Sequence, residues 1–128
     1  MATVLIVEDN AANMKLASLL LRNAGHTVVA AEDAETGLVI ARSERPDLIL
    51  MDIQLPCMDG LAATAVLKRD PATHTIPIIA LTAMAMKDDQ ARAKRAGCDA
   101  YIAKPLRYQE LYSTIDDLLA HVSRKESS

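Results

Sequence analysis

The stretch Asp47-Leu48-Ile49-Leu50-Met51-Asp52 sets four consecutive large apolar side chains between two aspartates. A strand with one face in water would alternate apolar and polar residues, and this run has no polar interruption. It is therefore typical of a strand covered on both faces, as in a parallel sheet. Two other short runs, at 4–7 and 78–81, have the same character.

On either side of this strand, short apolar runs alternate with longer amphipathic segments. Strands are predicted at 3–7, 27–30, 47–51, 76–81 and 100–102, and helices at 12–24, 34–44, 59–69, 87–96 and 107–121. Gly25 and Gly97 fall where helix C-caps are expected. Strict strand–helix alternation predicts one α/β domain of (βα)5 order, a doubly wound parallel five-stranded sheet with helices on both faces.

Composition limits the chain to one core and excludes several functions. The 128 residues are 51% hydrophobic with a net charge of −3, so nothing draws the chain to nucleic acid. No apolar stretch approaches the roughly 20 residues of a membrane span, and the start resembles no signal peptide, so we expect a cytoplasmic protein. Cys57 and Cys98 form no CxxC pair and are expected to be buried or bystander thiols. The domain is expected to cover 1–122, with 123–128 as a short, frayed polar tail.

Polar side chains gather at the ends of the apolar strands. Glu8 and Asp9 follow the first strand, Asp52 ends the third, and Thr82 and Lys104 end the fourth and fifth. The second strand ends in alanines, which suits an edge position. Ligands of doubly wound sheets bind at the carboxyl ends of the strands, so this rim is the predicted site.

Three carboxylates at one rim repel one another unless a cation separates them. Mg²⁺ prefers oxygen ligands and a few carboxylates, and Glu8, Asp9 and Asp52 meet that requirement. No Cys/His set competes, because His26, His74 and His121 lack ligand spacing and are expected at the surface.

One of the carboxylates can also act as a covalent nucleophile. A phosphoryl group on an aspartate needs its oxygens neutralised, and a metal ion, a lysine and a hydroxyl can do so. Lys104 and Thr82 supply the last two groups, so Asp52 is the predicted phosphorylation site.

Together these residues resemble response-regulator receiver domains. The resemblance rests on Glu8-Asp9, Asp52 at the end of Asp-Leu-Ile-Leu-Met-Asp, Thr82 and Lys104-Pro105, and it covers residues 3 to about 121. Single-domain regulators are the most similar members. It implies a flavodoxin-like sheet in the strand order 2-1-3-4-5.

The resemblance also implies a role for each site residue. Asp9, Asp52 and the backbone carbonyl of Gln54 would bind Mg²⁺, for which Mn²⁺ can substitute, and Glu8 would act mainly through water. Thr82 and Tyr101 would form the switch pair, with Tyr101 turning inward less completely than the phenylalanine that is frequent there. The Lys104–Pro105 bond is expected to be cis.

The same resemblance implies the partners. A histidine kinase or histidine phosphotransfer protein would donate the phosphoryl group, docking beside Asn10, Asn13, Met14 and Leu106. A downstream protein would bind the face of the fourth helix, fifth strand and fifth helix, where Met84 and Met86 are either binding surface or core. A monomer is expected, with dimerisation on phosphorylation as the alternative.

Other functions stay open at this stage. A phosphate-independent pseudo-receiver would lack Asp52, Thr82 or Lys104, and all three are present. A receiver excised from a hybrid histidine kinase is the second alternative. A phosphatase or nucleotide-binding enzyme would need a cap or a glycine-rich phosphate loop, and neither is found. The predicted function is therefore a signal-transfer protein, not an enzyme with an external substrate.

Overall fold

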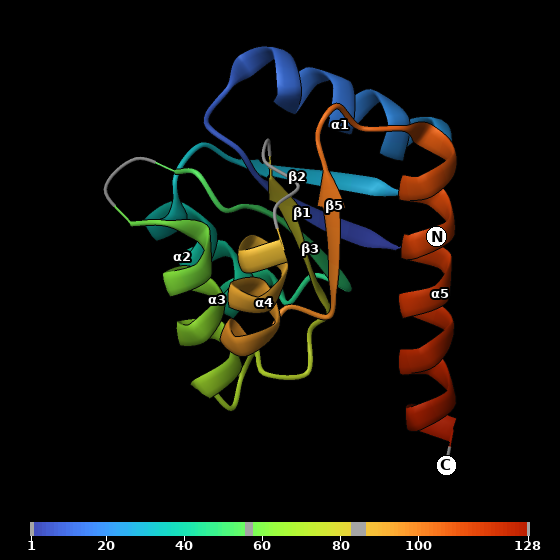
Figure 1. The fold of residues 1–128 in the computed structure, drawn as a ribbon. Helices are drawn as coiled ribbons and strands as arrows, with labels where there is room; N and C mark the ends of the chain where they lie inside the picture. Colours follow the sequence, from blue (N-terminus) through green and yellow to red (C-terminus); the bar gives the residue numbers. More distant parts are fainter. Residues whose placement is uncertain (1, 56–57, 83–86, 128) are drawn as a thin grey trace.

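The computed structural model describes residues 2–55, 58–82 and 87–127. Strands and helices alternate along the chain (Figure 1). In order they are β1 (Thr3–Val7), α1 (Ala11–Asn23), β2 (Thr27–Ala31), α2 (Ala34–Glu44), β3 (Leu48–Asp52), α3 (Gly60–Arg69), β4 (Ile78–Thr82), α4 (Lys87–Ala96), β5 (Ala100–Ala103) and α5 (Tyr108–Ser127).

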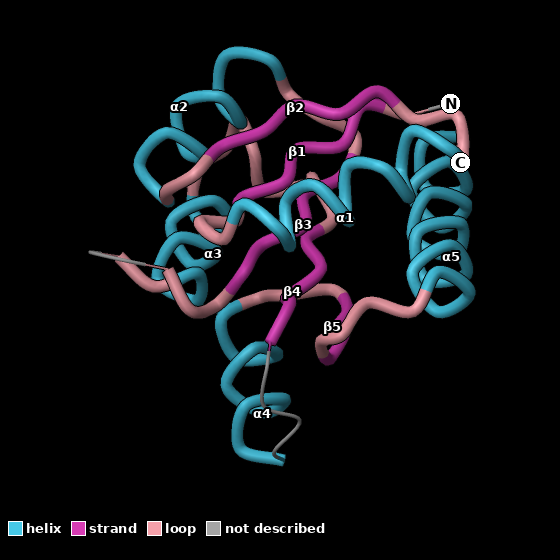
Figure 2. Tube along the Cα trace, turned by 90° about the horizontal axis from the view of Figure 1, so that it is seen from above, coloured by secondary structure: helices cyan, strands magenta, loops and turns pink. Residues whose placement is uncertain are grey.

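The five strands form one parallel sheet in the order β2-β1-β3-β4-β5, which confirms the predicted flavodoxin-like topology (Figure 2). β2 is at an edge, as its alanine-rich end suggested. Val7 pairs with Met51, and Asp52 pairs with Leu81. This register brings the carboxyl ends of the central strands to one level, and the topological switch lies between β1 and β3.

Helices cover both faces of the sheet, so alternate side chains of each central strand enter different cores. Figure 2 shows α1 and α5 on one side and α2 and α3 on the other. Leu5 and Val7 pack against α2 and α3, whereas Val4 and Ile6 pack against α1 and α5. The side chains of β3 are buried throughout, which explains its continuous apolar sequence.

Helix ends follow the local sequence, with one difference. Asn10, Asp33 and Asp59 cap the first three helices with their side chains, and Gly25 and Gly97 adopt positive φ as predicted. The tail predicted to fray after Val122 instead continues α5 to Ser127. No proline or glycine interrupts residues 123–127, and Arg124 and Lys125 favour a helix C-terminus.

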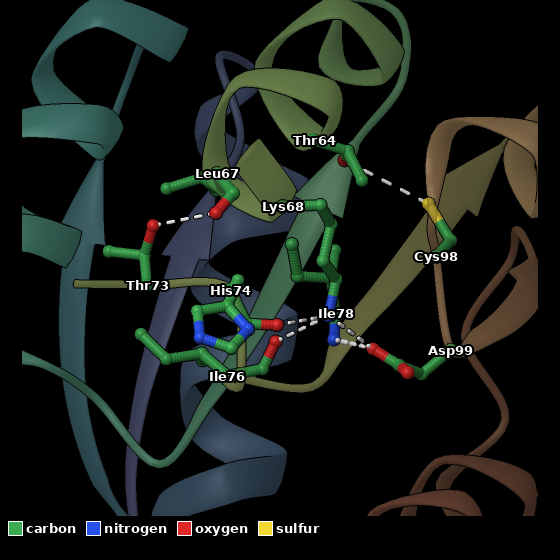
Figure 3. Close-up of polar contacts among 9 residues, drawn as sticks. All are labelled: Thr64, Leu67, Lys68, Thr73, His74, Ile76, Ile78, Cys98 and Asp99. Carbon is green, nitrogen blue, oxygen red and sulfur yellow. Dashed lines mark hydrogen bonds and ion pairs between the residues drawn. The ribbon is translucent and has the colours of Figure 1, made fainter. Parts of the chain in front are cut away.

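A polar network fastens α3 to the far end of the sheet (Figure 3). Nζ of Lys68 donates to the carbonyl of Ile76 at 2.9 Å and to Oδ2 of Asp99 at 3.0 Å. The same Asp99 oxygen accepts the backbone N–H of Ile78 at 2.8 Å. The network fixes β4 and the start of β5 against α3.

Some predicted features lie outside the described residues, namely Cys57, Met84 and Met86. Among the described cysteines, Cys98 is a free, half-buried thiol, and burial raises its pKa. His74 is exposed as expected, while His26 is half-buried, and its Nδ1 accepts the backbone N–H of Ala2. Among the described helices, none is long and apolar enough to cross a membrane.

Candidate phosphoryl-acceptor and metal site

The predicted site residues meet at the carboxyl edge of the sheet. Glu8 directly follows β1, Asp52 ends β3, and Lys104 follows β5. Nζ of Lys104 lies 3.0 Å from Oε1 of Glu8 and 3.2 Å from Oδ2 of Asp52. The lysine therefore bridges two carboxylates that come from neighbouring strands.

Burial distinguishes these carboxylates from ordinary surface acids. Glu8 and Asp52 are 2% and 3% exposed, while Asp9 is exposed. Oε2 of Glu8 is buried and meets no hydrogen-bond donor among the described residues. Burying a carboxylate oxygen without a hydrogen-bond donor costs free energy. Oε2 of Glu8 therefore marks a position where a bound ligand would supply the missing partner.

The backbone of the β3–α3 loop holds Asp52 in place. The N–H of Gln54 donates to Oδ1 of Asp52 at 2.9 Å, so this oxygen has a fixed position while Oδ2 faces Lys104. Thr82 is fully buried, and its carbonyl accepts the N–H of Lys104 at 2.6 Å. The Lys104–Pro105 peptide bond is cis, as the resemblance implied.

The electrostatics of the cluster are dominated by burial and by shared charge. Burial raises the pKa of Glu8 to about 7, and the adjacent Asp52 adds to this, while Lys104 and Asn13 partly oppose it. Burial alone would lower the pKa of Lys104, but its contacts with Glu8 and Asp52 outweigh burial and raise it. Two buried carboxylates, those of Glu8 and Asp52, thus share one ammonium group.

This cluster fits a magnesium ion. Glu8, Asp9 and Asp52 each offer a carboxylate oxygen, and these atoms lie within 4.8 Å of one another. The donor set is all oxygen, one buried oxygen lacks a donor, and the local charge is negative, which are the properties that suit a hard divalent cation.

The remaining predicted residues come from the start of α1, from β5 and from the loop that follows β5. Asn10 caps α1, and Asn13, Met14 and Leu106 are half-buried. Asn13 and Leu106 line a small cavity of about 40 Å³ together with Glu8 and Lys104. Tyr101 is half-buried against the core between α3, α4 and the sheet.

Some residues of the site were not predicted from the sequence. Asn13 was expected only at a docking edge, whereas its side chain also lowers the pKa of Glu8. Leu16 and Ala17, which line the same cavity from α1, were not expected at the site. The spacing of Asn13 and Leu16 in the first two turns of a helix that begins beside the acidic pair was the available signal.

The sequence of the chain also matches a known protein family. The sequence model of the response regulator receiver domain matches residues 4–116. The chain belongs to the response regulator receiver family. It is therefore a signalling protein of the two-component type, as the strand-end residues indicated.

Individual relatives agree with this assignment. The receiver is 46% identical to the polar-differentiation response regulator DivK of Brucella anthropi over 117 residues, which are 91% of this chain and 95% of that protein. A putative response regulator from Chloroflexus aurantiacus has a TM-score of 0.90 at 34% identity, covering 93% of this chain and 98% of that one.

A third relative concerns the metal. The receiver domain of a sensor histidine kinase from Pseudomonas aeruginosa is 34% identical, with a TM-score of 0.87 over 93% of this chain and 98% of that one. Its structure has a magnesium ion coordinated in the active site cleft.

Proposed function

We propose that this receiver accepts a phosphoryl group on Asp52 from a phosphohistidine of a histidine kinase or histidine phosphotransfer protein. The observation that carries the proposal is the position of the Asp52 carboxylate. It is almost fully buried at the sheet edge, 3.2 Å from an ammonium group and within 4.8 Å of two other carboxylates. A structural ion pair would not need a third acid, Asp9, beside the two that contact the lysine.

In this proposal, Asp52 is the nucleophile. An oxygen of its carboxylate bonds to phosphorus while the bond from phosphorus to the imidazole nitrogen of the donor breaks. The carboxylate is already ionised, so no general base is required. Lys104 shifts from the two carboxylates to the phosphoryl oxygens, and the hydroxyl of Thr82 donates to another oxygen.

Magnesium would be held by Asp9, Asp52 and the carbonyl of Gln54, with Glu8 acting through water, and Mn²⁺ would substitute for it. The bound ion would supply positive charge beside the transferring phosphoryl group. The buried, donor-free oxygen of Glu8 supports this assignment, since a metal-bound water would give it a hydrogen-bond donor.

The donor docks beside the site. Asn10, Asn13, Met14 and Leu106 form the proposed docking edge, and the cavity between α1 and the loop after β5 supports it because it opens next to Lys104. The receiver then acts in the cytoplasm, where two-component kinases present their phosphohistidine.

Phosphorylation would be reported through the face of α4, β5 and α5. Thr82 and Tyr101 are the proposed switch pair, and Tyr101 lines a hollow of about 240 Å³ with Gln90 and Ala93 of α4. A phosphoryl group that draws Thr82 inward would favour one of two states of this face, which a downstream protein distinguishes by affinity. The receiver is proposed to be a monomer before phosphorylation.

Incubation with a small phosphodonor and Mg²⁺ tests the proposal, with intact mass as the measurement. The wild-type chain should gain one phosphoryl group, and Asp52→Asn or EDTA should prevent the gain. Asp59→Asn is the matched control, because Asn also caps a helix and Asp59 is exposed at the end of the same loop. A phosphoryl group that still appears on Asp52→Asn would move the acceptor elsewhere.

A further inference from the structure

Gly60, the first residue of α3, lies directly on the main chain of Asp52. A Cβ built on Gly60 would fall on the carbonyl oxygen of Asp52, and it would lie 2.8 Å from the Asp52 carbonyl carbon and from Cα of Ile53. These obstacles are backbone atoms, so no side-chain rotation could make room. Only glycine allows the start of α3 to come this close to the end of β3.

Hydrogen bonds fix Gly60 in this position from two sides. Its N–H donates to the carbonyl of Ile53 at 3.3 Å. Its own carbonyl accepts the hydroxyl of Thr64, a fully buried side chain, at 2.8 Å. Sγ of Cys98 in turn donates to the Thr64 hydroxyl oxygen at 3.8 Å, which ties this turn of α3 to the start of β5 (Figure 3).

The same short segment of main chain carries the groups of the proposed site. Asp52 supplies the acceptor carboxylate, and Gln54 both donates its N–H to that carboxylate and offers the carbonyl proposed as a metal ligand. A displacement of the Asp52 carbonyl would therefore move both groups relative to Glu8 and Lys104, which are anchored on β1 and β5.

We propose that Gly60 is a positioning residue for the acceptor site: its missing side chain lets α3 hold the segment from Asp52 to Gln54 in the geometry that binds metal. Thr64 assists by holding the Gly60 carbonyl. The inference rests on the proposed metal and acceptor roles of these residues. It adds a steric requirement, a residue without Cβ at position 60, to the requirements for residue type and charge at the carboxyl edge of the sheet.

The test compares Gly60→Ala with wild type by Mg²⁺ titration followed in amide NMR spectra. We expect Mg²⁺ affinity to fall about 10–100-fold, the range found when a group that orients a metal ligand is lost. The amide signals of Asp52 and Gln54 should already be displaced in EDTA. Phosphorylation by a small phosphodonor should also be slower at saturating Mg²⁺, because Asp52 itself is misplaced.

Gly37→Ala is the matched control. It adds the same atom to another buried helical glycine, where the nearest obstacle is a methyl group of Val7 at 2.8 Å, a side-chain atom and not an atom of the Asp52 main chain. Its Mg²⁺ affinity should stay within about twofold of wild type. Unchanged Mg²⁺ affinity in a folded Gly60→Ala variant would overturn the inference.

If Gly60→Ala does not fold, the pair Thr64→Val and Thr64→Ser decides. Valine keeps the shape of threonine but cannot hold the Gly60 carbonyl, so it should weaken Mg²⁺ binding, and serine should restore it. Equal affinities for the two variants would overturn the inference. Failure of wild type to take a phosphoryl group would reject the proposed function alone, because the Mg²⁺ comparison does not depend on it.

Discussion

The protonation of the Glu8 side chain depends on whether a cation is bound beside it. One of its carboxylate oxygens bonds to Lys104, and the other is buried without a donor among the described residues. Burial and the neighbouring Asp52 raise its pKa to about 7, so near neutral pH the metal-free protein holds a proton there that Mg²⁺ must displace.

Glu8→Gln should alter the pH dependence of both stability and metal binding. The folded-state pKa lies above the ordinary glutamate pKa of 4.5, so the contribution of Glu8 to stability is fully present below about pH 4.5 and is lost as pH rises through 7. In EDTA, Glu8→Gln should therefore be more stable than wild type at pH 8, by about 1–3 kcal/mol, and nearly equal to it at pH 5. Urea unfolding at the two pH values measures this.

The affinity for Mg²⁺ should change with pH in the opposite direction to the stability contribution of Glu8. Wild-type affinity for Mg²⁺ should rise between pH 6 and pH 8 as the Glu8 proton is released, and the glutamine variant should lack this rise. A parallel pH dependence in both proteins would show that Glu8 is not the group that titrates.

At the level of elements, α3 is the part that joins the site to the rest of the sheet. Its first turn lies on Asp52, and its last turn carries Lys68, which bonds to the loop before β4 and to Asp99 before β5. A shift at one end of this helix is thus opposed at the other end.

Lys68→Met should destabilise the fold by about 1–3 kcal/mol, because it removes the side-chain donor to the Ile76 carbonyl and leaves Oδ2 of Asp99 with only the N–H of Ile78. Arg69→Met is the control: Arg69 is the next residue of the helix and is exposed, so its loss should change stability by less than about 0.5 kcal/mol. Urea unfolding compares them. Equal effects would mean that the Lys68 network contributes nothing beyond ordinary surface charge.

α4 differs from α3 in how little apolar surface it buries. From Gln90 to Ala96 its one fully buried side chain is Ala93, whereas α3 buries Leu61 and Leu67. Backbone amides of α4 should therefore exchange with solvent faster than those of α3, as measured by hydrogen exchange with mass spectrometry. Protection of α4 equal to that of α3 would show that its smaller buried apolar surface does not make α4 open more easily.

For the whole molecule, sequence patterns predicted the fold because periodicity and burial are directly linked. The uninterrupted apolar run before Asp52 is possible only where helices cover both faces, and the polar strand ends had to meet at one edge. The acidic character of that edge, with a lysine beside the carboxylates, followed from residue types alone.

Details that depend on close packing were beyond sequence analysis. The bridge from Lys104 to both Glu8 and Asp52 depends on rotamers that spacing does not define, and Asp59-Gly60 indicated only a turn, with no sign that Gly60 touches Asp52. The end of α5 was placed too early because its last turns are polar and carry no stop signal. The Lys68–Asp99 pair joins residues 31 positions apart, so sequence spacing alone does not predict it.

The most direct measurement of the central claim is a crystal structure of this chain with Mg²⁺ and beryllium fluoride, a mimic of the phosphoryl group. We predict a metal ion bound by Asp9, Asp52 and the Gln54 carbonyl, and beryllium fluoride on the Asp52 carboxylate in contact with Lys104 and Thr82. A structure with neither group at Asp52, and with Lys104 still bridging Glu8 and Asp52, would contradict the account.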